Sequence, residues 1–200
     1  MDYSLEDFIK FKQYLNTVDE VLNSYFEHQK EYIFCKKGCA YCCESGQYPY
    51  SELEFKYLLL GFFKIPLKEQ QEVIKRIKAL KEEYQNVENK KEFKYRCPFL
   101  SEEKICTVYD YRGLICRTFG LITLLDSGKC VIPFCHELGL NYSTVFDKST
   151  KKFDFDKIEE LGYKNIPHPR KTNIKTLMSP EMFENEPIDF GEIKNLVDWL

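Results

Sequence analysis

The segment Cys35-Lys-Lys-Gly-Cys39-Ala-Tyr-Cys42-Cys43 places four cysteines close together in the chain. Thiolates spaced this closely can converge on one point, which is typical of a metal ion or an iron–sulfur cluster. The chain has nine cysteines in all, and the others follow downstream at Cys97, Cys106, Cys116, Cys130 and Cys135. We therefore interpret the chain first as a metal-site protein.

The composition fits one ordinary globular domain. The chain has 200 residues, of which 44% are hydrophobic and 16% aromatic, and this is enough to build a core. Its formal net charge of -3 gives no reason to expect a nucleic acid partner, which needs a clearly basic face. No segment approaches the roughly 18 uninterrupted apolar residues of a membrane span, so no membrane partner is expected either.

The expected compartment decides how the cysteines are interpreted. Residues 1–7 are acidic and polar and lack the basic and apolar regions of a secretory signal, so we expect a cytoplasmic protein. Disulfides are rare in a reducing cytosol, and an odd number of cysteines argues against a simple disulfide framework. Metal ligation is therefore favoured over disulfide bonding.

Helical patterns dominate the first half of the chain. Ser4 is placed to cap a helix that runs to about Lys30, because apolar residues recur at helical spacing along it. Ser51-Glu52-Leu53-Glu54 has the form of a capping box and predicts a second helix to about Phe63. Residues 67–84 predict a third helix, with one apolar face above a Lys/Glu surface.

Shorter elements are expected after residue 95. Residues 121–132 predict a β-hairpin, with a turn at Asp126-Ser-Gly-Lys129. Residues 155–161 and 190–200 are expected to be helical. The predicted fold is mainly α with a small β-hairpin, a single compact domain organised around a cysteine-bound metal centre. Residues 1–140 would form the helical metal-binding domain, and residues 141–200 a peripheral C-terminal extension packed on it.

The first cysteine segment does not complete a metal site alone. Cys35, Cys39 and Cys42 can line one side of a tight loop, and a fourth thiolate must come from elsewhere in the chain. The candidate donors are Cys97, Cys106 and Cys116. Cys43 is expected to point away from Cys42 and to serve a second metal, bridge two metals or pack as a buried thiol. Cys43, Cys106, Cys116 and Cys135 are candidates for that second metal. Cys130, on the predicted hairpin, is expected to be a core residue.

Two motifs together resemble a known family. Cys35, Cys39, Cys42 and Cys43 form a CxxxCxxCC run, and Cys97-Pro-Phe-Leu, Cys106-x-x-Tyr109 and Arg112-x-x-x-Cys116-Arg117-x-Phe119 follow it. This order resembles the bacterial and archaeal cysteine-cluster family described as a zinc- or iron-chelating domain, over roughly residues 35 to 135. Gly113 stands where that family usually has proline.

The resemblance implies metal chelation through these cysteines. A related cysteine cluster occurs in flagellin lysine N-methylases, so the alternative is an S-adenosylmethionine-dependent methyltransferase with a protein lysine as substrate. The sequence lacks the Gly-rich strand-turn-helix that commonly holds S-adenosylmethionine. It also lacks a Ser/His/Asp order and an HExxH motif, so no catalytic residue is predicted. The spacing of Cys35, Cys39 and Cys42 also equals that of radical S-adenosylmethionine enzymes, but the β/α barrel expected after that motif is missing.

The identity of the metal stays open at this point. All-cysteine ligation suits tetrahedral zinc and a cubane cluster alike. We favour a [4Fe–4S] cluster, because several thiolates within a short segment are less crowded around four irons than around one ion. Arg117 is expected to offset the thiolate charge beside Cys116, and Tyr109 to donate a hydrogen bond to a sulfur or a carbonyl.

Overall fold

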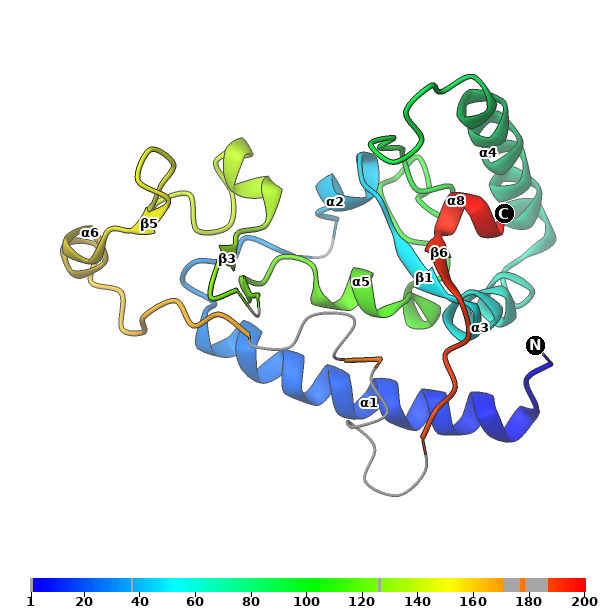
Figure 1. The fold of residues 1–200 in the computed structure, drawn as a ribbon, viewed down its shortest axis with the longest axis horizontal. Coiled ribbons are helices and arrows are strands. Elements are labelled where there is room, and N and C mark those ends of the chain that lie inside the picture. The colour runs from blue at the N-terminus through cyan, green and yellow to red at the C-terminus, as the bar shows by residue number, and fades with distance from the viewer. Residues whose placement is uncertain (1, 37, 126, 171–176, 179–186) are drawn as a thin grey trace.

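The fold is known from a computed structural model that describes residues 2–36, 38–125, 127–170, 177–178 and 187–200. Helix α1, Leu5–His28, runs along one side of the elongated molecule (Figure 1). Ser4 caps it as predicted: the Ser4 hydroxyl accepts a hydrogen bond from the Asp7 amide, and the Asp7 carboxylate accepts one from the Ser4 amide. One face of α1 is buried through Phe11, Leu15, Val18 and Leu22.

Helices α3, Glu52–Phe62, and α4, Leu67–Gln85, confirm the other two helical predictions. The predicted capping box opens α3, where the Ser51 hydroxyl accepts from the Glu54 amide and the Glu54 carboxylate accepts from the Ser51 amide. The apolar face of α4 buries Val73 and Leu80. The predicted mainly α fold is thus confirmed.

The C-terminal segment corrects the prediction of a helix over residues 190–200. Only α8, Leu196–Trp199, is helical there, and β6, Ile193–Asn195, pairs antiparallel with β1, Pro49–Ser51. The residues before β6 are extended because their carbonyls accept the free amides at the start of α3. Glu52 N donates to Glu192 O, and Leu53 N donates to Phe190 O. A helix in this segment would leave those two donors without partners.

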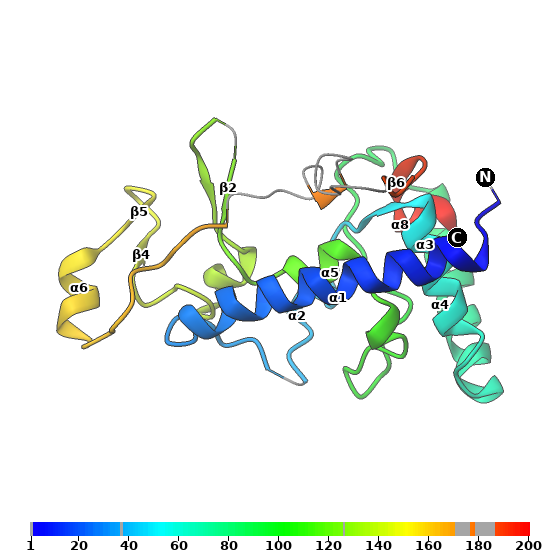
Figure 2. The ribbon, with the colours of Figure 1, turned by 90° about the horizontal axis from the view of Figure 1, so that it is seen from below.

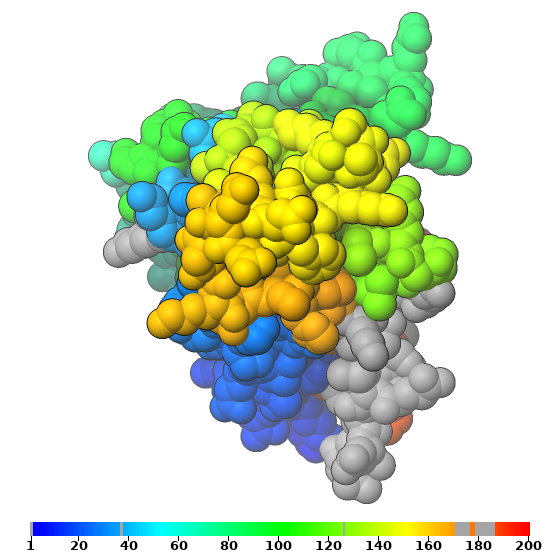
Figure 3. All heavy atoms as spheres, turned by 90° about the vertical axis from the view of Figure 1, so that its left-hand side faces the viewer, coloured from blue at the N-terminus to red at the C-terminus, as the bar shows by residue number. Residues whose placement is uncertain are grey.

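The opposite end of the molecule carries two small hairpins and a short helix. β2, Thr123–Leu124, pairs with β3, Cys130–Val131, which confirms the predicted hairpin, although Asp126 of its turn lies outside the described residues. β4, Phe146–Asp147, pairs with β5, Lys152–Phe153, and α6, Phe155–Glu160, follows. Figure 3 views this end, where these later elements lie in front of α1. Cys130 is exposed, so its prediction as a core residue is wrong. A two-residue strand in a hairpin that projects from the molecule cannot bury it.

Four short helices complete the described elements: α2, Tyr41–Glu44; η1, Tyr109–Tyr111; α5, Leu114–Thr118; and η2, Phe134–Leu138. Figure 2, seen from below, shows α4 and α6 at opposite ends of α1. No helix in the described ranges is long and apolar enough to cross a membrane.

Three buried clusters follow the long axis. The first lies among α3, α4 and α8 and includes Leu58, Val73 and Leu196. The second packs α1 against α3 and the segment around Phe190. The third, with Tyr32, Tyr142 and Ile158, lies near α6. The chain after residue 140 contributes to all three clusters, whereas the division into residues 1–140 and 141–200 stays a prediction.

Candidate metal centre

All nine cysteines lie in the described part of the chain and carry free thiols. Eight of them, all except Cys130, gather around α2 in two groups. We define the first group as Cys43, Cys97, Cys106 and Cys116, and the second group as Cys35, Cys39, Cys42 and Cys135. In Figure 1, α2 lies between the segment of η2 and β1, and β1 lies close to α5. Cys135 belongs to η2 and Cys116 to α5.

Cys43 and Cys97 are brought together by backbone pairing. The Cys97 amide donates to the Cys43 carbonyl at 2.8 Å, and Gly46 and Tyr95 exchange two hydrogen bonds of 3.1 Å. The Tyr48 hydroxyl then donates to the carbonyls of Cys42 and Tyr95, at 2.9 and 3.2 Å. The end of α2 is therefore fixed against the segment that carries Cys97.

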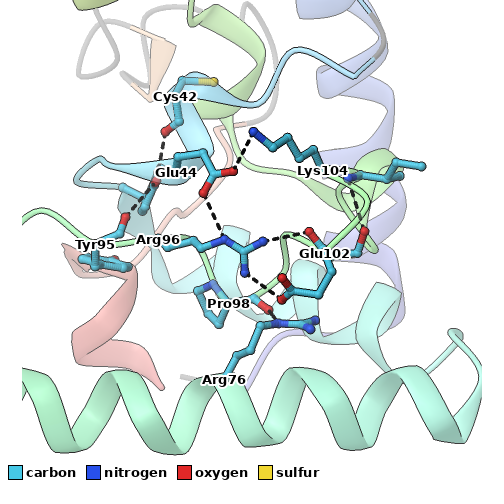
Figure 4. A network of polar contacts seen from close by, with 11 residues as sticks. Cys42, Glu44, Arg76, Tyr95, Arg96, Pro98, Glu102 and Lys104 are labelled. Atoms are coloured by element: carbon cyan, nitrogen blue, oxygen red, sulfur yellow. Dashed lines mark hydrogen bonds and ion pairs between the residues drawn. The ribbon is translucent and has the colours of Figure 1, made fainter.

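Charged side chains hold the same two segments on the solvent side. Arg96 Nε lies 3.0 Å from Glu44 Oε2, and Arg96 Nη1 lies 3.2 Å from Glu102 Oε1 (Figure 4). Lys104 Nζ lies 3.6 Å from the other oxygen of Glu44. These pairs are partly exposed, so each stabilises the folded chain only weakly, and their main effect is to orient α2 over the Cys97–Cys106 loop.

Cys97 and Cys106 lie on the two arms of a tight loop. Leu100 and Cys106 form an antiparallel bridge, and the Thr107 amide donates to the Phe99 carbonyl at 2.9 Å. Each thiol accepts a hydrogen bond from the backbone amide two residues later, Cys97 from Phe99 and Cys106 from Val108. Amide donors of this kind stabilise a thiolate and orient its sulfur, as they do around metal-bound cysteines.

Cys116 reaches the group through α5, whose start is fixed by Glu54. The fully buried Glu54 carboxylate accepts the Leu114 amide at 2.7 Å. The Tyr50 hydroxyl accepts the Gly113 amide at 2.9 Å and lies 3.4 Å from Cys116 Sγ. A Cβ at position 113 would lie 2.8 Å from both the Tyr50 ring and Glu54 Oε1, so the close approach of these groups requires glycine. Tyr50 was not found from the sequence, because no motif marks it.

Burial governs the protonation of the first group. It raises the pKa of Cys106 to about 11 and that of Cys116 to about 12, and it also raises the pKa of Cys97. Negative charge on the neighbouring thiols adds to the rise for all three. Cys43 differs: a hydrogen bond from the Cys42 thiol lowers its pKa. Negative charge on one of these thiols therefore opposes the ionisation of the others. Simultaneous ionisation needs a cation among them.

The nearby guanidinium is that of Arg112. Its charge lowers the pKa of Cys43, Cys106 and Cys116, and its guanidinium carbon lies 3.7 Å from the centroid of the Tyr109 ring. Tyr109 is exposed, and its ring packs against this guanidinium. Arg117 instead is buried, forms an ion pair with Asp19 of α1 and donates to two carbonyls of the η1 region. The sequence prediction chose Arg117, whereas the arginine whose charge acts on Cys43, Cys106 and Cys116 is Arg112.

The second group is held together by Asn141, which sequence reasoning missed. Asn141 Nδ2 donates to Cys35 Sγ at 3.1 Å, and the Asn141 backbone amide donates to the Cys135 thiol. Cys42 and Cys43 lie where the two groups meet, with their sulfurs 3.9 Å apart. The expectation that Cys43 points away from Cys42 is therefore wrong, because the two thiols lie within hydrogen-bonding distance of each other.

The donor chemistry fits a thiophilic metal, although the side chains are not closed around a point. As they stand, no three Cys, His, Asp or Glu side chains in the described ranges are arranged to hold a metal ion. A cysteine sulfur moves by rotation about one side-chain bond, and each group offers a set of soft donors with amide hydrogen bonds to its sulfurs. Closure of each set would accompany metal binding.

The comparison with protein families agrees with this donor set. Residues 34–136 match the CxxCxxCC family, described as a "putative zinc- or iron-chelating domain", and this is more than half of the chain. The chain belongs to this family. All eight cysteines of the two groups lie inside the segment matched to the CxxCxxCC domain, so the resemblance seen in the sequence is confirmed. The comparison with curated proteins found no match, and neither did the comparison with solved structures.

Proposed function

We propose that this CxxCxxCC protein binds a metal centre through Cys43, Cys97, Cys106 and Cys116. The observation that carries the proposal is the gathering of four thiols from three separate segments, two of them with amide hydrogen bonds to their own sulfurs. Four thiolates form a complete ligand set for zinc or for an iron–sulfur cluster. The chain's own contribution is to orient the sulfurs and to offset their charge with Arg112.

The metal would also stabilise the fold. α2 buries no side chain of its own, so a bound metal would join it to the Cys97–Cys106 loop and α5. Metal binding to thiols releases their protons, and its free energy then adds to the free energy of folding. Because free thiols are required, we place the protein in a reducing compartment, the cytoplasm. Between a zinc ion and an iron–sulfur cluster, we continue to favour a [4Fe–4S] cluster.

Metal analysis of anaerobically purified protein tests the proposal. Iron with acid-labile sulfide and a broad absorption band would identify a cluster, and zinc alone would identify a colourless tetrathiolate site. Cys106→Ser should lose this metal. The matched control is Cys130→Ser, since Cys130 is exposed on the β2–β3 hairpin and belongs to neither group. A wild-type chain purified without metal, and unable to take up zinc or iron, would contradict the proposal.

No contact in the described residues favours the methyltransferase alternative. One surface cavity of about 280 Å³ is lined by Gln47, Tyr84, Lys90, Lys91, Asn195 and Asp198. It contains none of the eight cysteines, so it offers no place for a substrate beside a metal centre. We therefore propose metal binding without an assigned reaction.

A further inference from the structure

The segment 187–200 lies outside the residues matched to the CxxCxxCC domain, yet it contacts the part of the chain that carries the cysteines. We call this segment the strap; it contains β6 and α8. β6 pairs with β1 along all three of its residues, and the Leu196 amide donates to the Tyr48 carbonyl at 2.8 Å. Figure 1 shows β6 and α8 beside β1 and α4. Among the described residues, β6 is the one strand that pairs with β1, so the strap fixes the position of β1.

Asn195 of the strap connects the two tyrosines that hold α2 against the Cys97 segment. Its side-chain oxygen accepts the Tyr48 amide at 3.0 Å and the Tyr95 hydroxyl at 2.8 Å. The Tyr95 hydroxyl in turn accepts the Val197 amide at 3.0 Å. Both tyrosines are buried, so a donor that loses its acceptor here costs free energy. Asn195 therefore fixes the segment before β1 relative to the segment that leads to Cys97.

The strap reaches Cys116 through Tyr50. Tyr50 lies opposite Lys194 in the β1–β6 pair, and its carbonyl accepts the indole N–H of Trp199 at 2.9 Å. Its side chain is buried, and its hydroxyl accepts the Gly113 amide and lies 3.4 Å from Cys116 Sγ. The strap thus holds the backbone of the residue whose hydroxyl touches the sulfur. A displacement of the strap would move that hydroxyl relative to Cys116.

The strap is a short unit whose far end is held near the surface. The Trp199 ring stacks on Phe55 with the ring centroids 5.6 Å apart, and the Tyr84 hydroxyl donates to Asp198 Oδ1 at 2.7 Å. A three-residue strand followed by a four-residue helix can open locally at a lower free-energy cost than the long helices α1 and α4. Trp199 is the single tryptophan of the chain, so its fluorescence reports on the strap.

We propose that the strap closes the metal centre, with Asn195 as a positioning residue for the segments that carry Cys43, Cys97 and Cys116. The proposal deepens the metal-binding function proposed above and rests on it. Attachment of the strap and binding of the metal then favour each other, because the coupling between two sites is reciprocal. Release of the strap opens the centre, so the strap regulates how tightly the chain holds its metal.

Substitution of Asn195 in the full chain tests this coupling. Asn195→Leu removes both hydrogen bonds and should lower the affinity for zinc by about 10- to 100-fold in competition with a chelator. Asn195→Asp keeps the acceptor oxygen and should restore most of that affinity. The matched control is Glu192→Gln, which changes an exposed carboxylate of the strap that pairs with Lys194 and should leave the affinity unchanged. Circular dichroism checks that each variant is folded.

A milder variant and two spectroscopic readouts separate positioning from general stability. Trp199→Phe keeps an aromatic ring and removes the hydrogen bond to Tyr50, so it should weaken zinc binding in the same direction. Cobalt bound to Asn195→Leu should absorb differently from cobalt bound to wild type, because the spectrum follows the geometry of the ligands and not the stability of the fold. In wild type, zinc should change the fluorescence of Trp199 and slow the hydrogen exchange of the Leu196 and Val197 amides.

The outcomes separate this proposal from the metal-binding function itself. Wild-type zinc affinity in both Asn195→Leu and Trp199→Phe, with the metal still lost in Cys106→Ser, would overturn the strap and leave the metal centre intact. Trp199→Phe alone decides if Asn195→Leu does not fold. Trp199 fluorescence that zinc leaves unchanged in wild type, or the same cobalt spectrum in wild type and Asn195→Leu, would also overturn the coupling. A wild-type chain that takes up neither zinc nor iron would overturn both proposals.

Discussion

Replacing Glu54 with glutamine should lower the free energy of unfolding by about 1–3 kcal/mol, the cost of a buried donor without an acceptor. Glu54 is fully buried, and its two carboxylate oxygens accept hydrogen bonds from two different segments of the chain. Oε2 accepts the Ser51 amide and hydroxyl, both at 2.8 Å, and Oε1 accepts the Leu114 amide at 2.7 Å. Glutamine has one acceptor oxygen, so its NH₂ group must face a donor either at Ser51 or at Leu114.

Thermal unfolding of the metal-loaded chain measures this effect. For a chain of this size, each kcal/mol lowers the melting temperature by roughly 2–4 °C, so the expected decrease is about 2–12 °C. The matched control is Glu72→Gln, which changes an exposed carboxylate of α4 that pairs with Lys75 and should cost less than about 0.5 kcal/mol. Equal melting temperatures for Glu54→Gln and Glu72→Gln would refute the role assigned to Glu54.

Wild type and Glu54→Gln should also differ in how their free energy of unfolding depends on pH. Burial raises the pKa of Glu54 above 4.5, against the lowering effect of its hydrogen bonds. The unfolded chain therefore loses this proton first as the pH rises, and wild-type stability should fall between pH 4.5 and the raised pKa. Glu54→Gln should lack this part of the slope. A stability difference between the two proteins that does not vary with pH would contradict the assignment.

Three further predictions concern single side chains. Tyr50→Phe removes the hydroxyl beside Cys116 and should lower metal affinity by about 10- to 100-fold in competition with a chelator; an unchanged affinity would exclude a role in the centre. Asp19→Asn weakens the partner of the buried Arg117 and should destabilise the chain by about 1.5–3 kcal/mol in urea unfolding, whereas the exposed neighbour Glu20→Gln should change stability by less than about 0.5 kcal/mol. The pKa of Asp147, lowered to about 2 by hydrogen bonds in the β4–β5 turn, should make stability fall as the pH drops from 3.8 towards 2, and an NMR titration at 3.8 or above would contradict this.

The helices of the first half could be predicted because their signals are local. Ser4 and Ser51 each form a capping box with an acidic residue three positions later, which marks the start of a helix in the sequence. The apolar period of α4 likewise predicts a helix from neighbouring residues alone. The segment 190–200 could not be predicted this way. Its backbone conformation is set by unpaired amides of α3, more than a hundred residues earlier, and sequence pattern does not record such pairing.

The candidate metal centre could likewise be predicted only in part from the sequence. The cysteines could be found from their spacing, but their division into two groups depends on which loop lies beside which. Cys135 joins Cys35 only because the buried Asn141 connects the two segments. The sequence favoured Arg117 as the cation because it follows Cys116 directly, and only the position of Asp19 on α1 assigns Arg117 to a structural ion pair.

X-ray absorption at the metal edge of the anaerobically purified protein tests the central claim most directly, because it reports the atoms bound to the metal. The first shell should consist of sulfur, at about 2.3 Å if the metal is zinc. Cys106→Ser should weaken this signal, and Cys130→Ser should leave it unchanged. A first shell of nitrogen and oxygen atoms, or a signal that Cys106→Ser leaves intact, would contradict a centre held by Cys43, Cys97, Cys106 and Cys116.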